Sequence, residues 1–321
     1  MHSCAILDDY QNVALSIADW GPLGGQVSTR VFNEHIEDRE ALVKALTEFD
    51  IIVAMRERTP FDAGLFDRLP KLKLLVTTGM RNASIDLEAA AKHKVTVCGT
   101  SGSVGSTAEL AWGLILALAR SIPQENALFH SGGKWQTTLG VGMNGKTLGV
   151  IGLGNLGART AKVGLALEMK VVAWSPRLTP ERCAEVGVTK AESLDDLLRA
   201  SDVVSIHVVL NEKSRGMIGA RELGLMKRDA ILVNTSRGPL VDEQALITAL
   251  REKRIGGAGI DVFGHEPLPQ DHPLRKLENV VATPHLGYVT REGYRTFYTH
   301  AVEDIKGWIA GSPVRVLQAG K

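Results

Sequence analysis

Short apolar runs alternate with amphipathic stretches along most of the chain. Before residue 100 the apolar runs have the length of buried strands, at Cys4–Leu7, Val27–Val31, Ile51–Ala54, Leu74–Thr77 and Val95–Cys98. A helical pattern at Asp38–Leu46 has Asp38 as its expected N-cap, and a second pattern lies at Asp62–Leu69. The expected buried face of the first helix consists of Ala41, Leu42 and Leu46. Strands and helices in this alternation predict a parallel sheet that is covered on both faces.

The same alternation resumes after Lys146. Strands are predicted at Leu148–Ile151, Lys170–Ala173, Val203–His207, Ala230–Val233, Gly257–Ile260 and Val280–Ala282. Helical patterns fall at Ser193–Ala200 and Glu243–Lys253, and a longer one covers Thr290–Ala310. This order predicts a doubly wound Rossmann-type domain. A last strand-like segment, Val314–Leu317, could return to the first sheet.

Two unusual segments separate the two halves. Gly99–Ser106 is rich in small residues and is interpreted as a linker or hinge between domains. Thr107–Ile122 is a helical pattern that is apolar nearly all round, so it should be buried in its own domain or in a subunit interface. Glu109 interrupts this apolar surface, and a buried glutamate would need a cationic partner.

The composition narrows the class of protein. A chain of 321 residues is long enough for two domains, and a formal net charge of +1 gives no reason to expect nucleic acid or an anionic membrane as a partner. The three cysteines form no CxxC pair and no metal-ligand spacing, so we expect reduced thiols and no metal site. The N-terminus lacks a secretory signal, and the most apolar stretch, Leu110–Ala119, is too short to cross a bilayer. These features predict a soluble, cytoplasmic protein.

A glycine-rich turn follows the first strand of the second half. Its glycines, Gly152, Gly154 and Gly157, have the GxGxxG spacing of a dinucleotide-binding turn. In such a turn the first glycine permits the tight bend, the second lets the backbone approach a pyrophosphate, and the third lets helix and strand pack closely. The start of the following helix, with Asn155 and Leu156, would offer free N–H groups to the anion. A purely structural glycine turn is the alternative.

The residues after the next strand bear on the choice of dinucleotide. A Rossmann site that prefers NAD usually has an acidic residue here, which accepts from the ribose 2′-hydroxyl, but this strand is followed by Ser175-Pro176-Arg177. Ser175 can donate to a 2′-phosphate and Arg177 can pair with it. We therefore expect NAD or NADP, with a slight preference for NADP. Alternatively, Arg177 is a solvated loop residue and NAD binds through the rest of the site.

Three later strands each end at a polar residue, and the carboxyl ends of strands line the ligand crevice in open α/β sheets. The segments are Asn234-Thr235-Ser236-Arg237-Gly238, Asp261-Val262-Phe263-Gly264-His265-Glu266-Pro267 and Thr283-Pro284-His285-Leu286-Gly287. Arg237 has the planar, charged fork that suits a substrate carboxylate. His285 can give a proton to the oxygen of a ketone during its reduction, and Glu266 can orient the imidazole. Each of the three, taken alone, is more often structural.

The glycine turn and these three segments, in this order, resemble the D-isomer-specific 2-hydroxyacid dehydrogenases. The resemblance covers nearly the whole chain. It implies that Arg237 holds the substrate, that His285 is the acid–base and that Glu266 is its partner. It also implies that Asp261 faces the nicotinamide end of the cofactor. The other residues that it places along the cofactor are His207, Leu210, Thr235 and Gly287.

The same resemblance implies an arrangement for the whole chain. A doubly wound Rossmann cofactor domain would be inserted into a smaller, flavodoxin-like α/β substrate domain, with boundaries at 102–287 for the first and 1–101 with 288–321 for the second. Gly99–Ser103 and Leu286–Thr290 would be the two hinge strands. The family is usually dimeric, and Thr107–Ile122 matches its interface helix, so a homodimer is expected.

A loop of the first domain is similar to the family's carboxylate-binding loop, in which the backbone N–H groups of Gly79, Met80 and Arg81 would hold the substrate acid. Arg81 stands where a second glycine is usual. It could favour a doubly anionic or polar substrate, or it could pair with an acidic neighbour at the surface. Tyr288 is another departure, since small residues are usual there, and it affects the expected shape of the substrate pocket.

The leading hypothesis is an oxidoreductase that moves a hydride between NAD(P)H and a small 2-keto acid or D-2-hydroxy acid. One alternative is phosphoglycerate dehydrogenase, in which Arg81 or Arg56 would bind the substrate phosphate. Formate dehydrogenase resembles the family as well, but Glu266 argues against it. A non-catalytic dinucleotide sensor is a further alternative, and the combination of Arg237, Glu266 and His285 favours turnover over it.

Overall fold

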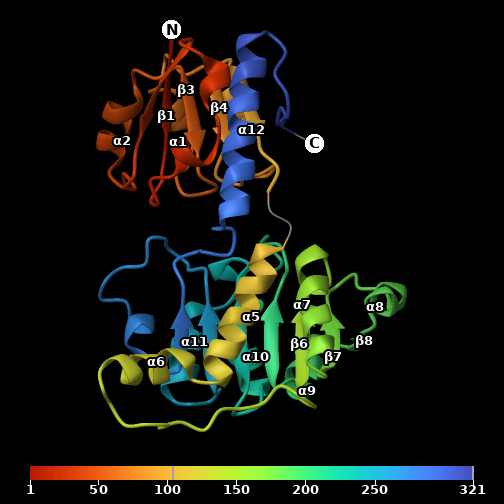
Figure 1. Cartoon of the computed structure of the whole chain (residues 1–321). Helices are drawn as coiled ribbons and strands as arrows, with labels where there is room; N and C mark the ends of the chain where they lie inside the picture. Colours follow the sequence, from red (N-terminus) through yellow and green to blue (C-terminus); the bar gives the residue numbers. More distant parts are fainter. Residues whose placement is uncertain (103–104, 320–321) are drawn as a thin grey trace. The chain divides into compact units, whose positions relative to one another are not determined.

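The computed structural model describes residues 1–102 and 105–319. The chain divides into two compact units, Met1–Ser103 with Val289–Lys321 (unit 1) and Val104–Tyr288 (unit 2). Each unit contains a parallel sheet with helices on both faces (Figure 1), which confirms the expected α/β fold class. Ser103, the last residue of the expected hinge Gly99–Ser103, lies outside the described residues. Within the described ranges no helix is both long enough and apolar enough to cross a membrane.

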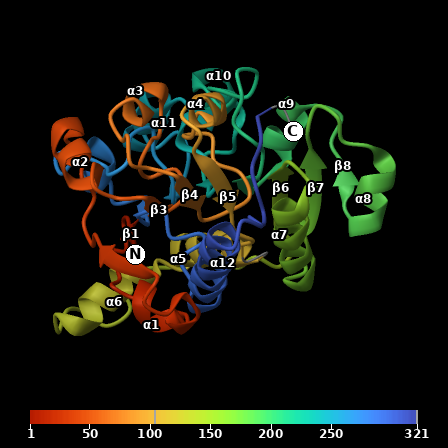
Figure 2. The ribbon, with the colours of Figure 1, turned by 90° about the horizontal axis from the view of Figure 1, so that it is seen from above.

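Unit 1 contains a five-stranded sheet with the order β2-β1-β3-β4-β5, which is the order of flavodoxin-like folds. Figure 2 shows β1, β3, β4 and β5 following one another across this sheet. All the expected strands are confirmed, with the first and last displaced by one or two residues. The elements of unit 1 are β1 (His2–Ile6), α1 (Ala14–Ile17), η1 (Gly21–Leu23), β2 (Val27–Val31), α2 (Arg39–Leu46), β3 (Ile51–Ala54), α3 (Ala63–Phe66), β4 (Leu74–Thr77), α4 (Leu87–Lys92), β5 (Thr96–Gly99) and α12 (Arg291–Ile309).

Helix α2 illustrates how the helices of unit 1 cover the sheet. The Asp38 side chain accepts a hydrogen bond from the Ala41 N–H at 2.8 Å, so Asp38 is the N-cap as expected. Leu42, Val43 and Leu46 are buried and belong to the core on this side of the sheet. Ala41 was expected on this face but is exposed, because residues advance by about 100° each round a helix and the stripe centred on Leu42, Val43 and Leu46 leaves it on the other side. Helix α12 packs against β4 on the opposite face.

The segment after α12 returns to the sheet of unit 1, as was expected for Val314–Leu317. Val316 forms an antiparallel bridge with Cys98 at the edge strand β5. Arg315 anchors the segment, because its Nε donates to Oδ1 of the fully buried Asp304 at 3.0 Å. Burial raises the pKa of Asp304 to about 7, although the guanidinium of Arg315 opposes the rise. This segment is therefore held to the edge strand by a short bridge and to α12 by the ion pairs of Arg315 with Asp304 and Glu303.

Unit 2 contains a seven-stranded sheet with the order β12-β11-β10-β9-β6-β7-β8. The order reverses between β6 and β9, which is the switch point where ligands bind in doubly wound sheets. Strand β8, which has only two residues, was not expected. The elements of unit 2 are α5 (Ser106–Ala119), α6 (Ile122–His130), β6 (Thr147–Ile151), α7 (Asn155–Ala166), β7 (Lys170–Trp174), α8 (Pro180–Val186), β8 (Thr189–Lys190), α9 (Leu194–Ala200), β9 (Val203–Ile206), α10 (Ala220–Leu225), β10 (Ile231–Asn234), η2 (Gly238–Leu240), α11 (Glu243–Arg251), β11 (Gly257–Ile260), η3 (Pro273–Lys276) and β12 (Val280–Ala282).

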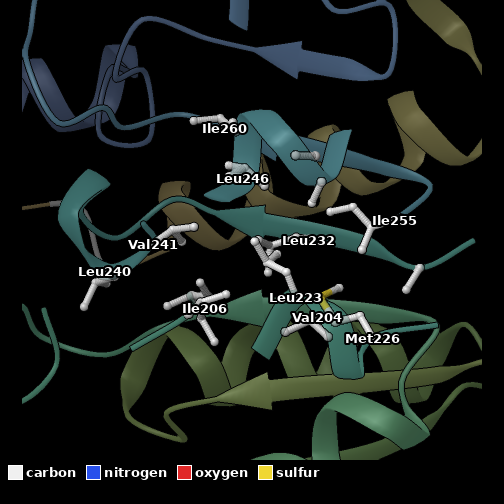
Figure 3. Packing of buried hydrophobic residues seen from close by; sticks show 14 of the residues in the cluster. Val204, Ile206, Leu223, Met226, Leu232, Leu240, Val241, Leu246, Ile255 and Ile260 are labelled. Carbon is white, nitrogen blue, oxygen red and sulfur yellow. The ribbon is translucent and has the colours of Figure 1, made fainter. Parts of the chain in front are cut away.

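Apolar side chains bury both faces of the unit 2 sheet. On one face, Val204 and Ile206 of β9 and Leu232 of β10 pack with Leu223 of α10 and Leu246 of α11 (Figure 3). Helices α5 and α7 bury the other face, together with residues of β6 and β7. Because the core holds both faces, the carboxyl ends of the strands form a rigid edge on which polar side chains can be presented.

Helix α5 differs in two ways from the expected helix Thr107–Ile122. It ends at Ala119, because Ser121 adopts a left-handed φ of 48° and a proline lies in the first turn of α6. Glu109 is exposed, so the expectation of a buried carboxylate is wrong. It lies on the side of α5 that faces away from the core, while the apolar side packs on the sheet of its own unit. Burial in its own domain is therefore the alternative that the structure supports for this helix.

Candidate functional site

The glycine turn joins β6 to α7 at the switch point of the unit 2 sheet. Gly152 has a φ of 95°, and a Cβ at Gly157 would overlap the carbonyl oxygen of Gly152, so both positions require glycine. A Cβ at Gly154 would meet no atom of the described residues within 4 Å. The open space beside Gly154 fits an anion that approaches the backbone there. Helix α7 begins at Asn155, so the N–H groups of Asn155 and Leu156 lie in its first turn, where helical N–H groups have no helical partner.

Ser175 and Arg177 follow β7, next to the glycine turn in the sheet. Ser175 is half-buried and Arg177 is exposed. Neither side chain has a hydrogen-bond or ion-pair partner in the part of the chain that the structure describes. The hydroxyl and the guanidinium are therefore both free to contact a ligand. No acidic side chain immediately follows β7.

Three further residues that were expected along the cofactor follow β9 and β10. Nε2 of His207 lies 2.8 Å from Oγ of Ser205, while its Nδ1 is buried with no partner among the described residues. Burial lowers the pKa of His207 to about 4, so the imidazole is neutral at physiological pH. Oγ1 of Thr235 is likewise buried without a partner in residues 1–102 and 105–319. Buried polar atoms are nearly always hydrogen-bonded, so these two atoms indicate that a ligand or water completes the site. Leu210 is half-buried in the loop after β9.

Asp261 follows β11 and organises the segment after β12. Its buried carboxylate accepts hydrogen bonds from Thr283 Oγ1 at 2.6 Å, from the Leu286 N–H at 2.7 Å and from the Gly287 N–H at 2.8 Å. Burial raises the pKa of Asp261, and the three hydrogen bonds oppose that rise. The segment that they hold contains His285, whose φ is 56°. A left-handed φ costs a non-glycine residue roughly 1–2 kcal/mol, so the bonds to Asp261 stabilise a backbone conformation that His285 would not adopt alone.

Glu266 and His285 form a hydrogen-bonded pair. Oε2 of Glu266 lies 2.6 Å from Nδ1 of His285, and Oε1 accepts from the Phe263 N–H at 2.9 Å. Burial acts to raise the pKa of Glu266, but its hydrogen bond with His285, the charge of that imidazole, the Phe263 N–H and the charge of Arg237 together lower it. Nε2 of His285 has no hydrogen-bond partner in the described part of the chain. An imidazole held in this way at Nδ1 can exchange a proton through Nε2. The ring of Tyr288 lies edge-on to it, with centroids 5.4 Å apart.

Arg237 is half-buried just after β10, and its Nη1 donates to the carbonyl oxygen of Ser236 at 2.7 Å. Its charge contributes to lowering the pKa of Glu266, so the two side chains are electrostatically coupled. Strands β10, β11 and β12 are neighbours in the sheet. The structure therefore brings Arg237, Glu266 and His285 to one edge of unit 2. This edge also carries the glycine turn.

The expected substrate loop follows β4 in unit 1. Gly79 has a φ of 107°, and its N–H donates to Oγ1 of Thr100 at 2.9 Å, so the N–H groups of Met80 and Arg81 are the ones left for a ligand. A Cβ at Gly79 would overlap Nη1 of Arg56, so this guanidinium covers the loop. Arg81 is exposed and has no ion-pair partner within the described residues. The expected alternative of a surface pair between Arg81 and an acidic neighbour is not formed.

Two residues at the carboxyl edge of the unit 2 sheet were not assigned a role from the sequence. Asn234, the last residue of β10, hydrogen-bonds the backbone of the loop that carries Arg237, and Thr283 bonds Asp261. An asparagine that precedes small polar residues at the end of a strand is typical of a turn closed by its side chain, and this pattern could have identified Asn234. Thr283 is the first polar residue after its strand, but nothing local indicates that its hydroxyl bonds Asp261. In the described residues no group of three or more His, Cys, Asp or Glu side chains is placed to hold a metal ion.

Known proteins share both the sequence and the fold of this chain. A family model described as "D-isomer specific 2-hydroxyacid dehydrogenase, NAD binding domain" matches residues 112–287. The D-3-phosphoglycerate dehydrogenase of Archaeoglobus fulgidus is 39% identical over 280 residues, which are 86% of this chain and 53% of that protein. The glyoxylate reductase of Aeropyrum pernix is 39% identical over 259 residues, 78% of this chain and 77% of that protein. The crystal structure of a phosphoglycerate oxidoreductase from Vibrio cholerae matches with a TM-score of 0.92 and 36% identity, over 97% of this chain and 100% of that one.

The extent of these matches differs between relatives. The chain spans about half the length of the phosphoglycerate dehydrogenase and about three quarters of the glyoxylate reductase. The family model covers more than half of this chain and includes the glycine turn, Arg237, Glu266 and His285. The resemblance seen in the sequence motifs is thus confirmed, and the chain belongs to the D-isomer-specific 2-hydroxyacid dehydrogenase family.

Proposed function

We propose that this protein is an NAD(P)-dependent oxidoreductase that interconverts a small 2-keto acid and the corresponding D-2-hydroxy acid. The observation that carries the proposal is the hydrogen bond between Glu266 and His285, at a sheet edge that also presents Arg237 and the glycine turn. Membership of the family supports the reaction class. It also supports reading unit 2 as the dinucleotide-binding domain and unit 1 as the substrate domain.

Each residue of the trio has a distinct role in the proposal. When bound, the nicotinamide supplies the hydride for the carbonyl carbon. His285 donates a proton from Nε2 to the carbonyl oxygen as negative charge develops there. Glu266 keeps Nδ1 engaged and stabilises the charged imidazole, and Arg237 pairs with the substrate carboxylate and the carbonyl oxygen. In the direction of oxidation the same imidazole accepts the proton.

The remaining expected residues bind the cofactor or the substrate in this proposal, or hold the segment that carries His285. Gly152, Gly154 and the first turn of α7 hold the pyrophosphate, as the open space beside Gly154 supports. His207, Leu210, Thr235 and Gly287 lie along the rest of the cofactor, and the unpartnered Nδ1 of His207 and Oγ1 of Thr235 support this placement. Asp261 acts through the His285 segment, because its carboxylate accepts from the Leu286 and Gly287 N–H groups and from the Thr283 hydroxyl. The N–H groups of Met80 and Arg81 hold the substrate acid.

A spectrophotometric screen tests the function. The purified full chain is mixed with NADH or NADPH and with a panel of 2-keto acids that includes glyoxylate and hydroxypyruvate, and the loss of absorbance of the reduced cofactor is followed. We expect oxidation that depends on the keto acid. Tight binding of NAD(H) without such oxidation would support the alternative of a non-catalytic dinucleotide sensor and contradict the proposal.

NADP is favoured slightly over NAD as the cofactor. The support comes from Ser175 and Arg177, whose side chains have no partner in the described ranges and follow the strand next to the glycine turn. A hydroxyl and a guanidinium suit a 2′-phosphate, and an acidic residue that would repel this phosphate is missing from the position.

Phosphoglycerate dehydrogenase is the second candidate function, and one observation favours it. The guanidinium of Arg56 covers Gly79 in the expected substrate loop, and the neighbouring Arg81 has no ion-pair partner among the described residues. Two cations beside a carboxylate-binding loop suit a substrate that carries a phosphate as well as a carboxylate. Activity on 3-phosphohydroxypyruvate that exceeds activity on glyoxylate, and that falls in Arg56→Ala, would favour this candidate.

The proposal includes a homodimer. The support is a group of large apolar side chains on α6 and the loop after it, which we call the apolar arm and which comprises Ile122, Phe129, Trp135, Leu139 and Val141. All five are exposed in the single chain, and Leu139 is 98% exposed. So many exposed apolar side chains in one short segment are typical of a protein–protein contact. A second copy of the chain is the partner that we propose, since most oligomers of soluble proteins are symmetric homo-oligomers.

A further inference from the structure

The loop that carries Arg237 is closed by the side chain of a single residue. Asn234, which is 4% exposed, donates from Nδ2 to the carbonyl oxygen of Arg237 at 2.9 Å. Its Oδ1 accepts from the Ser236 N–H at 3.0 Å. The Ser236 hydroxyl in turn donates to the carbonyl oxygen of Ile206 at 2.7 Å, which ties the loop to the neighbouring strand β9. The amide nitrogen and oxygen of Asn234 thus both bond the backbone of Ser236 and Arg237. The position of this backbone sets the direction in which the Arg237 side chain extends.

The residue after Arg237 connects this loop to the one that holds Glu266. A Cβ at Gly238 would overlap the backbone of Phe263 and Gly264, so the two loops are in direct backbone contact. The Phe263 N–H is the group that orients the Glu266 carboxylate, at 2.9 Å from Oε1. A shift of the Arg237 loop would therefore be passed to the Glu266 carboxylate, or would open a gap between the loops.

We infer that Asn234 is a positioning residue for Arg237. It fixes the backbone from which the Arg237 side chain extends, and therefore the position of the guanidinium relative to the Glu266–His285 pair. The substrate carbonyl is then held where His285 can protonate it. This inference rests on the proposed function, because the role of Arg237 as the substrate clamp belongs to that proposal. A positioning role of this kind predicts that Asn234 matters for catalysis only while Arg237 is present.

A double-mutant cycle with keto-acid reduction as the readout tests this inference. Asn234→Asp keeps the acceptor for the Ser236 N–H and replaces the donor to Arg237 O by a carboxylate oxygen, which repels that carbonyl. We expect it to lower kcat/KM by about 10- to 100-fold, mainly through KM for the keto acid, because a displaced clamp weakens substrate alignment. The Kd for NADH, measured by fluorescence, should change by much less than kcat/KM, since Thr235 is the one residue of this loop among those proposed along the cofactor and the glycine turn holds the pyrophosphate. In an Arg237→Ala background the same substitution should change kcat/KM by less than about threefold.

The control is Asn279→Asp, which removes an equivalent bond from an asparagine Nδ2 to the Leu250 carbonyl oxygen, 3.1 Å long, just before the amino end of β12. It should leave kcat/KM unchanged. If Asn234→Asp lowers kcat/KM equally in both backgrounds, or weakens NADH binding in parallel, the inference is overturned. If Arg237→Ala itself is fully active, the proposed role of Arg237 fails and the inference fails with it.

Hydrogen–deuterium exchange provides a readout that does not need turnover. Asn234→Asp should speed amide exchange in residues 235–238, with the protection of the 283–287 segment retained because Asp261 holds it separately. Unchanged exchange in residues 235–238 would contradict the inference whatever the substrate proves to be.

Discussion

Nδ1 of His285 and Oε2 of Glu266 lie 2.6 Å apart, although the two residues are 19 positions apart in the chain and follow different strands. Each partner is fixed by a separate set of backbone contacts. The Phe263 N–H orients the carboxylate, and the Leu286 and Gly287 N–H groups donate to Asp261, which holds the segment that carries the imidazole. The pair is therefore preorganised by the fold of unit 2, and one ring nitrogen of His285 is left to exchange a proton.

Replacing His285 by glutamine should lower kcat for keto-acid reduction by about 10²- to 10⁴-fold, the range that acid–base catalysis usually contributes. Glutamine keeps the approximate size and polarity of the side chain but cannot donate a proton with a suitable pKa. NADH binding should be retained, because His285 lies outside the glycine turn. Steady-state kinetics with a fluorescence titration of NADH would check both points. An undiminished kcat would show that another group supplies the proton.

Glu266→Gln should change the pH profile of kcat as well as its size. The pKa of Glu266 is lowered by His285 and its other partners, so the carboxylate is anionic throughout the neutral range and favours a charged imidazole beside it. Without that anion, the alkaline limb of the profile for keto-acid reduction should move to lower pH. Profiles of kcat between pH 5 and 9 for the wild type and the variant measure this. If the alkaline limb lies at the same pH in both profiles and only the maximal kcat differs, the charge of Glu266 does not act on the imidazole and its role is steric.

Ser175→Asp should shift cofactor preference toward NADH. A carboxylate at this position would accept from a ribose 2′-hydroxyl and repel a 2′-phosphate. The ratio of kcat/KM for NADPH to that for NADH should fall by about tenfold or more, since one charge–charge contact is worth about 1–2 kcal/mol. Ser312→Asp, the same change in an exposed residue after α12, is the control. An unchanged ratio would place the 2′ position of the ribose away from Ser175.

Leu139→Asp should dissociate the proposed dimer. The side chain is 98% exposed in the single chain, so a charge there is harmless to a monomer but would be buried in an interface through the apolar arm. Light scattering coupled to size exclusion would give the molar mass of the wild type and the variant. Leu15→Asp is the control, because Leu15 is another exposed leucine, 49% exposed, on α1. A wild-type mass equal to that of one chain would contradict the homodimer directly.

His207 should make the protein less stable in mild acid. The pKa of His207 is lowered to about 4 by burial, whereas an unfolded histidine titrates near 6.5. Between these values the unfolded state binds a proton that the folded state does not, so stability falls as the pH is lowered from about 6.5 to about 4, by at most about 1.4 kcal/mol per pH unit. His207→Gln should lose less stability over this window than the wild type. Tm values across the window test it, with the exposed His130→Gln as the control that should follow the wild type.

The elements themselves could be predicted from the sequence. Apolar runs bounded by polar residues identified the strands at Val27–Val31, Ile51–Ala54 and Gly257–Ile260 with the bounds that the structure has. Strand β8 was missed because two residues are too few to form a pattern. The expected helix Thr107–Ile122 was too long because its apolar pattern continues past Ala119, while the backbone of Ser121 turns.

By itself the sequence determined which chemical groups are available and the strand ends on which they stand. Arg237, Glu266 and His285 each follow an apolar run, and the parallel order of such runs puts their carboxyl ends on one edge. Only the tertiary structure decided how these groups are held. Asp261 bonds residues 22 to 26 positions away, and Gly238 contacts the backbone of the Glu266 loop. Such contacts depend on which strands become neighbours and at what register, and no local pattern of residues encodes them.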